Sequence, residues 1–139
     1  MALIKSLLAL LLGAFLLSAG TSHLGSNRTE FLAQVPTWLP LDPDFVVIAS
    51  GLVEITLGAL LIITALILKK YRGVIGVITA VFFILIFPGN INQYVNHLDA
   101  FGLDTDTKRF IRLLFQPPLV ALALWCSDGL GLLKKLKQI

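Results

Sequence analysis

Residues 45–68 read FVVIASGLVEITLGALLIITALIL, an apolar run whose single charged side chain is Glu54. The run stops at the basic cluster Lys69-Lys70-Tyr71-Arg72. A helix needs about 20 apolar residues to cross the hydrocarbon core of a bilayer. The stretch therefore predicts a transmembrane helix, and the basic cluster marks the end at which that helix leaves the membrane.

Three further apolar stretches flank this run. The first covers residues 3–20 with Lys5 as its one charge, the third covers residues 73–92, and the fourth covers residues 110–127. None shows the alternation of apolar and polar residues that is typical of strands. The sequence therefore predicts an all-α fold, in which residues 1–139 form one domain, a four-transmembrane-helix bundle.

The first stretch has a second interpretation. Lys5, the apolar run after it and the tripeptide Leu17-Ser18-Ala19 also fit a secretory signal peptide with its cleavage site. Cleavage would leave three spans, and the distribution of charges described below fits four spans better.

The composition favours a membrane protein and excludes several other classes. Hydrophobic residues make up 57% of the chain and charged residues 14%, against roughly 25% charged residues in soluble domains. The single cysteine, Cys126, excludes an intrachain disulfide, a CxxC pair and an all-cysteine metal site. Because the basic residues lie beside apolar stretches and not in a groove with interleaved aromatics, we expect no nucleic-acid partner.

Basic residues concentrate at one end of the predicted bundle. Four spans bring the N-terminus, residues 69–72 and the C-terminal tail to one side, whose only acid is Asp128. Lysine and arginine near the ends of spans are retained in the cytoplasm. We therefore expect cytoplasmic N- and C-termini. The basic residues of that side are Lys5, Lys69, Lys70, Arg72, Lys134, Lys135 and Lys137.

The first long loop, residues 21–44, is predicted to lie outside. It contains Pro36, Pro40 and Pro43, and Trp38 is placed to sit at the membrane interface. Residues 29–33 are predicted to form one short helical turn on the surface.

Glu54 is the most unusual residue of the predicted bundle. At ~1.5 Å per residue it lies about 13 Å from the start of its span, near the middle of the membrane. Exposure of a carboxylate to lipid there would cost several kcal/mol, so Glu54 is predicted to point inward. Gly51, Gly58 and Ala65 share its face and allow a neighbouring helix to approach closely. Two roles are open: helix packing alone, or the handling of a ligand or a proton.

The other spans carry polar residues in the predicted outer half. Arg112 either snorkels to the outer interface or pairs with Glu54. Pro88 removes a backbone hydrogen bond, so the freed carbonyl and two asparagine amides need partners inside the protein, unless the proline simply ends the helix. The candidate ligand-binding residues are His23, Glu54, Asn90, Asn92, Arg112 and Gln116.

These residues come from four spans and predict a polar cavity that opens toward the outside. His23 and His97 lie in neither an HExxH motif nor a two-histidine-plus-carboxylate spacing, so we predict no metal site. No catalytic residue is assigned. Because no pair of haem ligands is evident, electrons for any redox reaction would come from a partner.

Several short motifs follow one another along the chain. After a histidine that closes the first span come VPTWLP at 35–40, SGLVEI at 50–55 and FPGN at 87–90. This order resembles the DoxX-like family of small membrane proteins. The resemblance covers nearly the whole chain and implies a four-helix membrane bundle. Some members of this family are associated with quinone-linked sulfur oxidation or oxidative-stress complexes, and some relatives act as membrane chaperones. The pattern covers His23, Pro36, Trp38, Pro40, Gly51, Glu54, Gly58, Pro88 and Asn90.

Three functions fit this pattern. The first is an accessory subunit of a membrane redox complex that binds a quinone or similar amphiphile, with Glu54 handling a proton and Arg112, Asn90 or Gln116 holding a carbonyl. The second is a non-enzymatic chaperone or assembly factor that recruits other membrane proteins through its small-residue faces and loops. The third is a small-solute transporter. We expect a multi-pass protein of a bacterial inner (plasma) membrane. Its expected partners are the lipid bilayer and either another membrane protein or further copies of itself as a homo-oligomer.

Overall fold

The computed structural model describes residues 1–139, and every regular element in it is helical. Four segments are long and apolar enough to cross a membrane: Ala2–Leu24, Pro43–Leu66, Lys69–Val95 and Asp106–Cys126. The predicted all-α fold with four candidate spans is therefore confirmed. Such an arrangement is compatible with a multi-pass integral membrane protein.

The first two spans are each one uninterrupted helix. Helix α1 covers Ala2–Leu24 and helix α3 covers Pro43–Leu66. Helix α3 starts sharply because the carboxylate of Asp42 accepts a hydrogen bond from the backbone N–H of Phe45, 2.9 Å away, while Pro43 occupies the first turn. Both features are typical of a helix start.

The third span continues farther than predicted. A 3₁₀ turn, η2 (Lys69–Tyr71), leads into helix α4 (Arg72–Val95), which runs through Pro88 and past the predicted end at Asn92. The alternative in which the proline ends the helix is therefore wrong. A proline removes only the hydrogen bond from its own nitrogen, and the last turns of α4 are held by contacts with the loop after α1.

The fourth span is broken. Helix α5 (Asp106–Leu114) and helix α6 (Gln116–Cys126) meet at Phe115, where the predicted single run over 110–127 has a discontinuity. Pro117 and Pro118 have no N–H with which to continue the hydrogen-bond ladder across this point.

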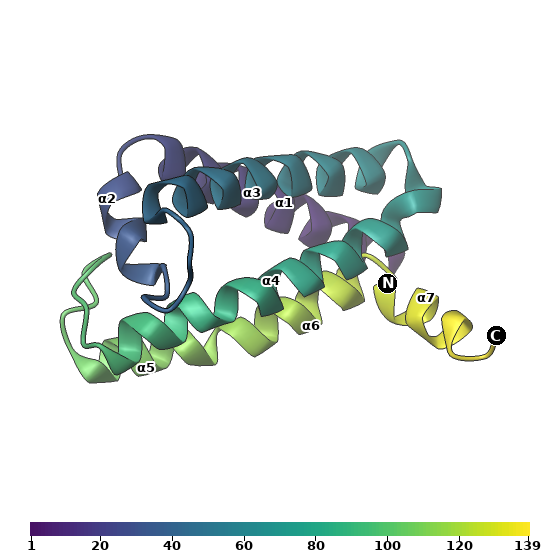
Figure 1. Ribbon diagram of the computed structural model, residues 1–139. Coiled ribbons are helices and arrows are strands. Elements are labelled where there is room, and N and C mark those ends of the chain that lie inside the picture. Colours follow the sequence, from purple (N-terminus) through teal and green to yellow (C-terminus); the bar gives the residue numbers. More distant parts are fainter.

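Three shorter helices complete the fold. Helix α2 (Arg28–Phe31) and the 3₁₀ turn η1 (Leu32–Gln34) confirm the predicted helical turn in the first loop. Helix α7 (Gly129–Leu136) follows α6 and projects from the bundle (Figure 1). The two chain ends lie at the same end of the bundle, where Lys5 pairs with Asp128 at 2.5 Å. We call this the terminal end, and the opposite one the α2 end.

The helices pack as two pairs, α1 with α3 and α4 with α6, and the pairs contact each other less extensively. Glycines allow the first pair to approach closely. A Cβ atom added at Gly58 would lie 2.6 Å from the carbonyl oxygen of Gly13, and one added at Gly20 would lie 2.6 Å from that of Gly51. The predicted small-residue faces of the two helices therefore pack against each other, as expected for helices in lipid.

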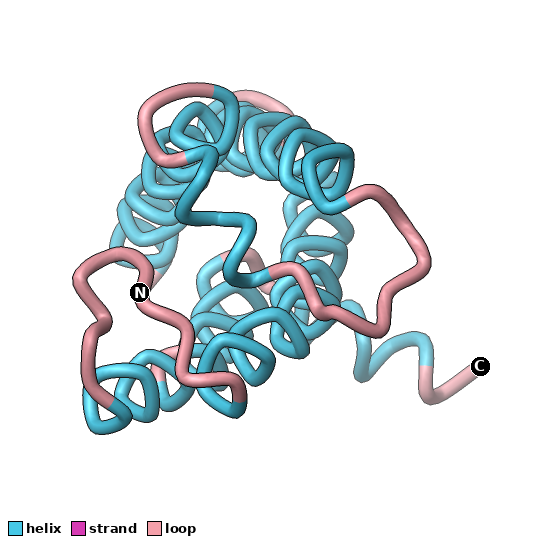
Figure 2. Tube along the Cα trace, turned by 60° about the vertical axis from the view of Figure 1, so that its left-hand side comes forward, coloured by secondary structure: helices cyan, strands magenta, loops and turns pink.

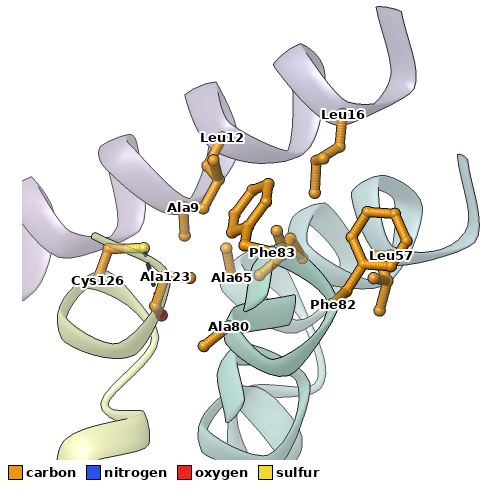
Figure 3. Packing of buried hydrophobic residues seen from close by; sticks show 11 residues of the cluster. Ala9, Leu12, Leu16, Leu57, Ala65, Ala80, Phe82, Phe83, Ala123 and Cys126 are labelled. Atoms are coloured by element: carbon orange, nitrogen blue, oxygen red, sulfur yellow. Dashed lines mark hydrogen bonds between the residues drawn. The ribbon is translucent and has the colours of Figure 1, made fainter. Parts of the chain in front are cut away.

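The apolar core fills the half of the bundle nearer the terminal end. Figure 3 shows alanines of all four spans next to Leu12, Leu16 and Phe83. Arg72 is buried there as well, and its guanidinium donates to the Ser6 hydroxyl at 3.2 Å and to the carbonyl of Cys126. The buried cluster comprises Ala9, Leu12, Leu16, Leu57, Leu61, Ala65, Ala80, Phe82, Phe83, Ala123 and Cys126.

Candidate functional site

A cavity of about 640 Å³ occupies the half of the bundle nearer the α2 end. Residues of α1, α3, α4, α5 and α6 line it, together with the loop segment that crosses this end of the bundle (Figure 2). Most of the wall is apolar. The polar side chains that carry the chemistry of the site are His23, Ser50, Glu54, Arg112 and Gln116.

Four of the six predicted ligand-binding residues thus line one cavity, namely His23, Glu54, Arg112 and Gln116, and Asn90 and Asn92 do not. Asn90 instead donates a hydrogen bond of 3.2 Å to the side-chain oxygen of Gln116. Asn92 donates to the carbonyls of Ala33 at 3.2 Å and Val35 at 3.3 Å. Asn90 therefore fixes Gln116 in the cavity wall, and Asn92 fixes the loop that covers the cavity.

The close packing of α1 on α3 brings His23 and Glu54 together. His23 lies over Gly51, where an added Cβ would be 2.6 Å from the Cβ of the histidine. The Nε2 atom of His23 is 3.4 Å from Oε2 of Glu54, and each side chain is only 7% exposed. Neither of these two atoms has a hydrogen-bond partner. Buried polar groups without partners are rare in proteins, so each calls for a physical explanation such as a ligand or an ordered water.

Arg112 does not form the predicted ion pair with Glu54, because the carboxylate of Glu54 lies against His23 instead. The guanidinium faces the cavity from α5 and donates at 3.4 Å to the side-chain oxygen of Gln116. Arg112 is therefore turned inward, one of the two orientations that the sequence allowed, but its hydrogen-bond partner is Gln116 and not Glu54.

Gln116 stands at the centre of a hydrogen-bonded network. Its amide nitrogen donates to the carbonyl of Phe83 at 2.7 Å, and its oxygen accepts from Asn90 and Arg112. The side chain is almost fully buried. Because its main hydrogen-bonding capacity is already used, Gln116 positions Arg112 and leaves the remaining N–H groups of that guanidinium facing the cavity.

Aromatic rings form a part of the site that the sequence did not indicate. Phe31 packs on the ring of His23 with 3.4 Å between centroids, and Phe101 packs edge-on against Phe31 at 4.7 Å. Trp38 and Phe115 also line the cavity. Phe31 and Phe101 come from loops far apart in the chain, where no periodic pattern could have revealed their convergence.

The loop that closes the α2 end is tied down by polar contacts. Gln34 donates to the side chain of Gln93 on α4 at 3.1 Å. Arg28 forms a two-point ion pair with Asp44 at the start of α3. The hydrogen bonds that Arg28 donates to Asp44 raise the pKa of Arg28 above its ordinary value. The cavity is thus covered by an ordered segment at this end.

Several apolar residues of the cavity wall also reach the outer surface of the bundle. Phe15 on α1, Leu85 on α4 and Phe115 between α5 and α6 all line the cavity, yet they are 51%, 71% and 59% exposed. The apolar wall of the cavity is therefore continuous with the outer apolar surface of the bundle at these residues.

The site offers hydrogen bonding and proton exchange. No group of three or more His, Cys, Asp or Glu side chains lies together in the chain, so the donors that metal sites use most are not clustered here. The fold and the site together describe a helical bundle with four helices long and apolar enough to span a membrane and with a partly polar cavity at one end.

Residues 12–127 match the model of a family described as a domain of unknown function, DUF8561, and the chain belongs to this family. The matched range contains the cavity residues described above. Neither the curated proteins nor the solved structures contain a match to the chain.

Proposed function

We propose that this protein binds a membrane-soluble amphiphile, a quinone or a molecule of similar shape, in the cavity near the α2 end. The observation that carries the proposal is the buried pair of His23 and Glu54 on the wall of a mostly apolar cavity. The two atoms that face each other, Nε2 and Oε2, have no hydrogen-bond partner. Leaving a buried polar group unsatisfied costs about 1–3 kcal/mol. A ligand that hydrogen-bonds to this wall offsets part of that cost.

The size and the lining of the cavity suit an aromatic head group. Ligand sites usually enclose about 300–1,000 Å³ and are mostly apolar with a few placed polar groups; this cavity of about 640 Å³ fits that description. The apolar wall that continues to the outer surface of the bundle suits an aliphatic tail that extends into lipid. A water-soluble solute would gain nothing from such a wall, which disfavours the transporter hypothesis.

We assign the protein an accessory role in a membrane redox complex. Glu54 and Arg112 can exchange a proton and hold an oxygen of the ligand, but the chain brings no electron carrier of its own that we can identify from its residues. Electrons would come from a partner protein. The resemblance to DoxX-like proteins, some of which are associated with quinone-linked oxidation, supports this assignment.

The bacterial inner membrane is the proposed location, with both termini in the cytoplasm. The support is that the terminal end carries the basic turn at 69–72 and the lysines of and after α7, while the α2 end carries most of the acids. Lysine and arginine near span ends favour the cytoplasmic side.

The chaperone hypothesis loses one of its supports. It required small-residue faces that are free to recruit other proteins, but the face of Gly51 and Gly58 is occupied by α1 of the same chain. Recruitment would have to use other surfaces.

The test is mass spectrometry of small molecules extracted from protein purified in mild detergent. Wild type is compared with Glu54→Met, which keeps the volume of the side chain but removes its oxygens, and with Asp104→Asn, a control that removes an exposed carboxylate. We expect a defined amphiphile enriched in wild type and control and depleted about tenfold in Glu54→Met. Bulk phospholipid alone in all three samples would overturn the proposal.

A further inference from the structure

The hydrogen bonds of His23 determine which of its ring nitrogens carries a proton. Its Nδ1 atom lies 3.0 Å from the carbonyl oxygen of Val47, which can only accept a hydrogen bond. Nδ1 therefore carries a hydrogen. Ser50 donates its own hydroxyl to the same carbonyl at 3.0 Å, and its oxygen lies 3.0 Å from Nδ1, where it accepts. In the neutral imidazole, Nε2 then presents a lone pair.

That lone pair faces a carboxylate oxygen. Nε2 of His23 and Oε2 of Glu54 are 3.4 Å apart and fully buried. Two lone pairs at this distance in a low-dielectric site repel each other, whereas one proton between them makes the contact favourable. The proton sits either on Oε2 or on Nε2, and in both states it lies between these two buried atoms.

The second oxygen of Glu54 is consequently restricted to one role. Oε1 receives no hydrogen bond from the protein, and Glu54 lines the cavity. With the shared proton held at Oε2 or Nε2, Oε1 has only lone pairs and can accept a hydrogen bond but not donate one. A ligand group that meets this wall must therefore bring its own hydrogen.

Arg112, on the other wall of the cavity, does not discriminate between a carbonyl and a hydroxyl group of the ligand. Arg112 donates from α5, and a guanidinium hydrogen bonds to a carbonyl oxygen or to a hydroxyl oxygen equally well. Phe31 and Phe115 supply flat apolar surface for a ring between the two walls. Selection between chemical forms of the ligand is thus left to Glu54 and the histidine behind it.

We infer that the cavity prefers an aromatic amphiphile bearing a hydroxyl group, a hydroquinone or phenol, over the matching carbonyl form, the quinone. This inference rests on the proposed function, since it names the form of the ligand that the same cavity holds. A carbonyl placed against Oε1 would set two acceptors against each other. We expect about tenfold tighter binding of the hydroxyl form, which for a two-electron couple corresponds to a shift of about 30 mV in the potential of the bound ligand.

The experiment measures the affinity of purified protein in detergent for three probes with the same decyl tail: a hydroquinone under anaerobic conditions, its benzoquinone and its dimethyl ether. Quenching of tryptophan fluorescence reports binding, because Trp38 lines the cavity. The dimethyl ether keeps the ring but has no hydrogen to donate. We expect the hydroquinone to bind about tenfold more tightly than the other two.

Three variants separate a role in proton placement from a merely structural one. In Glu54→Gln the amide N–H₂ can donate to Nε2 of His23, so the amide oxygen takes the place of Oε1 and the preference for hydroquinone is retained. Glu54→Met removes the acceptor and abolishes the preference. His23→Phe keeps a ring of similar shape but removes Nε2, so a proton on Glu54 is free to move to Oε1 and the preference falls toward parity. Gel filtration of each variant checks that it is folded.

The outcomes distinguish this inference from the proposed function. Equal affinity of wild type for hydroquinone and benzoquinone would overturn the inference and leave the proposed function standing. Binding of none of the probes, together with an absence of enriched amphiphile in the extracts, would overturn the proposed function itself. An unchanged preference in a folded His23→Phe variant would also contradict the inference, because the histidine would then not control the proton.

Discussion

The two halves of the bundle are made from the same four spans but differ in how they are filled. Toward the terminal end, alanines pack with a few large side chains such as Leu12 and Phe83 to form the buried apolar cluster (Figure 3). Toward the α2 end, the two helix pairs enclose a cavity of about 640 Å³ with acidic, basic and aromatic side chains on its wall. One half is solid and apolar, and the other is hollow and partly polar.

This difference indicates how a small membrane protein combines rigidity with a binding site. Helices in lipid gain little from the hydrophobic effect and associate through close packing and hydrogen bonds. The glycine contacts between α1 and α3 supply close packing along this pair, and the buried Arg72 supplies hydrogen bonds near the terminal end. We interpret this half as the support that keeps the spans apart at the other end.

The largest effect is expected from a substitution that breaks the packing of α1 on α3. A Cβ at Gly58 would lie 2.6 Å from the carbonyl oxygen of Gly13 and 2.9 Å from the backbone nitrogen of Leu17. Backbone atoms cannot move aside without separating the helices, so Gly58→Leu should cost more than the usual 1–3 kcal/mol, roughly, of overpacking. We expect loss of a monodisperse peak in size-exclusion chromatography.

Gly131→Leu is the control for this substitution, since nothing lies within 4 Å of a Cβ added at that position of α7. It should elute like wild type. A Gly58→Leu protein that elutes and melts like wild type would show that the close approach of α1 and α3 does not support the fold.

A smaller effect, of opposite sign in the two variants compared, is expected in the hollow half. Glu54→Met removes a buried carboxylate whose facing oxygen lacks a hydrogen bond, and should stabilise the ligand-free protein by about 1 kcal/mol. Gln116→Met removes a side chain that bonds to Phe83, Asn90 and Arg112, and should destabilise it by about 1–3 kcal/mol. Thermal unfolding in detergent measures both.

If Glu54→Met destabilised the protein as much as Gln116→Met, Glu54 would have a packing role and the comparison between satisfied and unsatisfied polar groups would fail. If Glu54→Met instead gains stability and loses the ligand, Glu54 is retained for binding at a cost in stability.

The smallest effect is expected at the exposed surface of the α2 end. The hydrogen bond from Lys108, 2.6 Å long, lowers the pKa of Asp104. A carboxylate with a lowered pKa contributes stability that is present above its unfolded pKa and is lost as the pH falls through the folded value. Asp104→Asn should therefore lower the melting temperature slightly between about pH 6 and 8, where the carboxylate is ionised, and the difference from wild type should shrink below about pH 4. A difference that does not shrink in acid would mean that the charge of Asp104 is not its source.

Much of the fold could be read from the sequence, because apolar length decides whether a helix can span a bilayer. The spans, the short helix in the first loop and the inward face of Glu54 follow from local composition and spacing. Two boundaries were missed. Helix α4 continues through Pro88 because the loop residues Ala33 and Val35 bond to Asn92 beyond it, and the fourth span breaks at Phe115 ahead of two prolines.

The candidate site was predictable only in part. Intramembrane polar residues are costly in lipid, so His23, Glu54, Arg112 and Gln116 stood out before their positions were known. Their pairing was not evident, and Glu54 meets His23 instead of Arg112. Partners across helices depend on the rotation and register of whole spans, which a single span does not encode.

By itself the sequence determined the class of the protein: a chain with a mean hydropathy of +0.90 and four apolar stretches can satisfy its backbone in a membrane only by forming helices. It also determined which residues are too polar for lipid and must turn inward. The tertiary structure alone decided that Gly20 and Gly51 bring His23 against Glu54, and that Asn90 and Gln116 hold Arg112 at the cavity. The physical reason is that burial is set by each residue's own chemistry, whereas contact is set by the packing of distant segments.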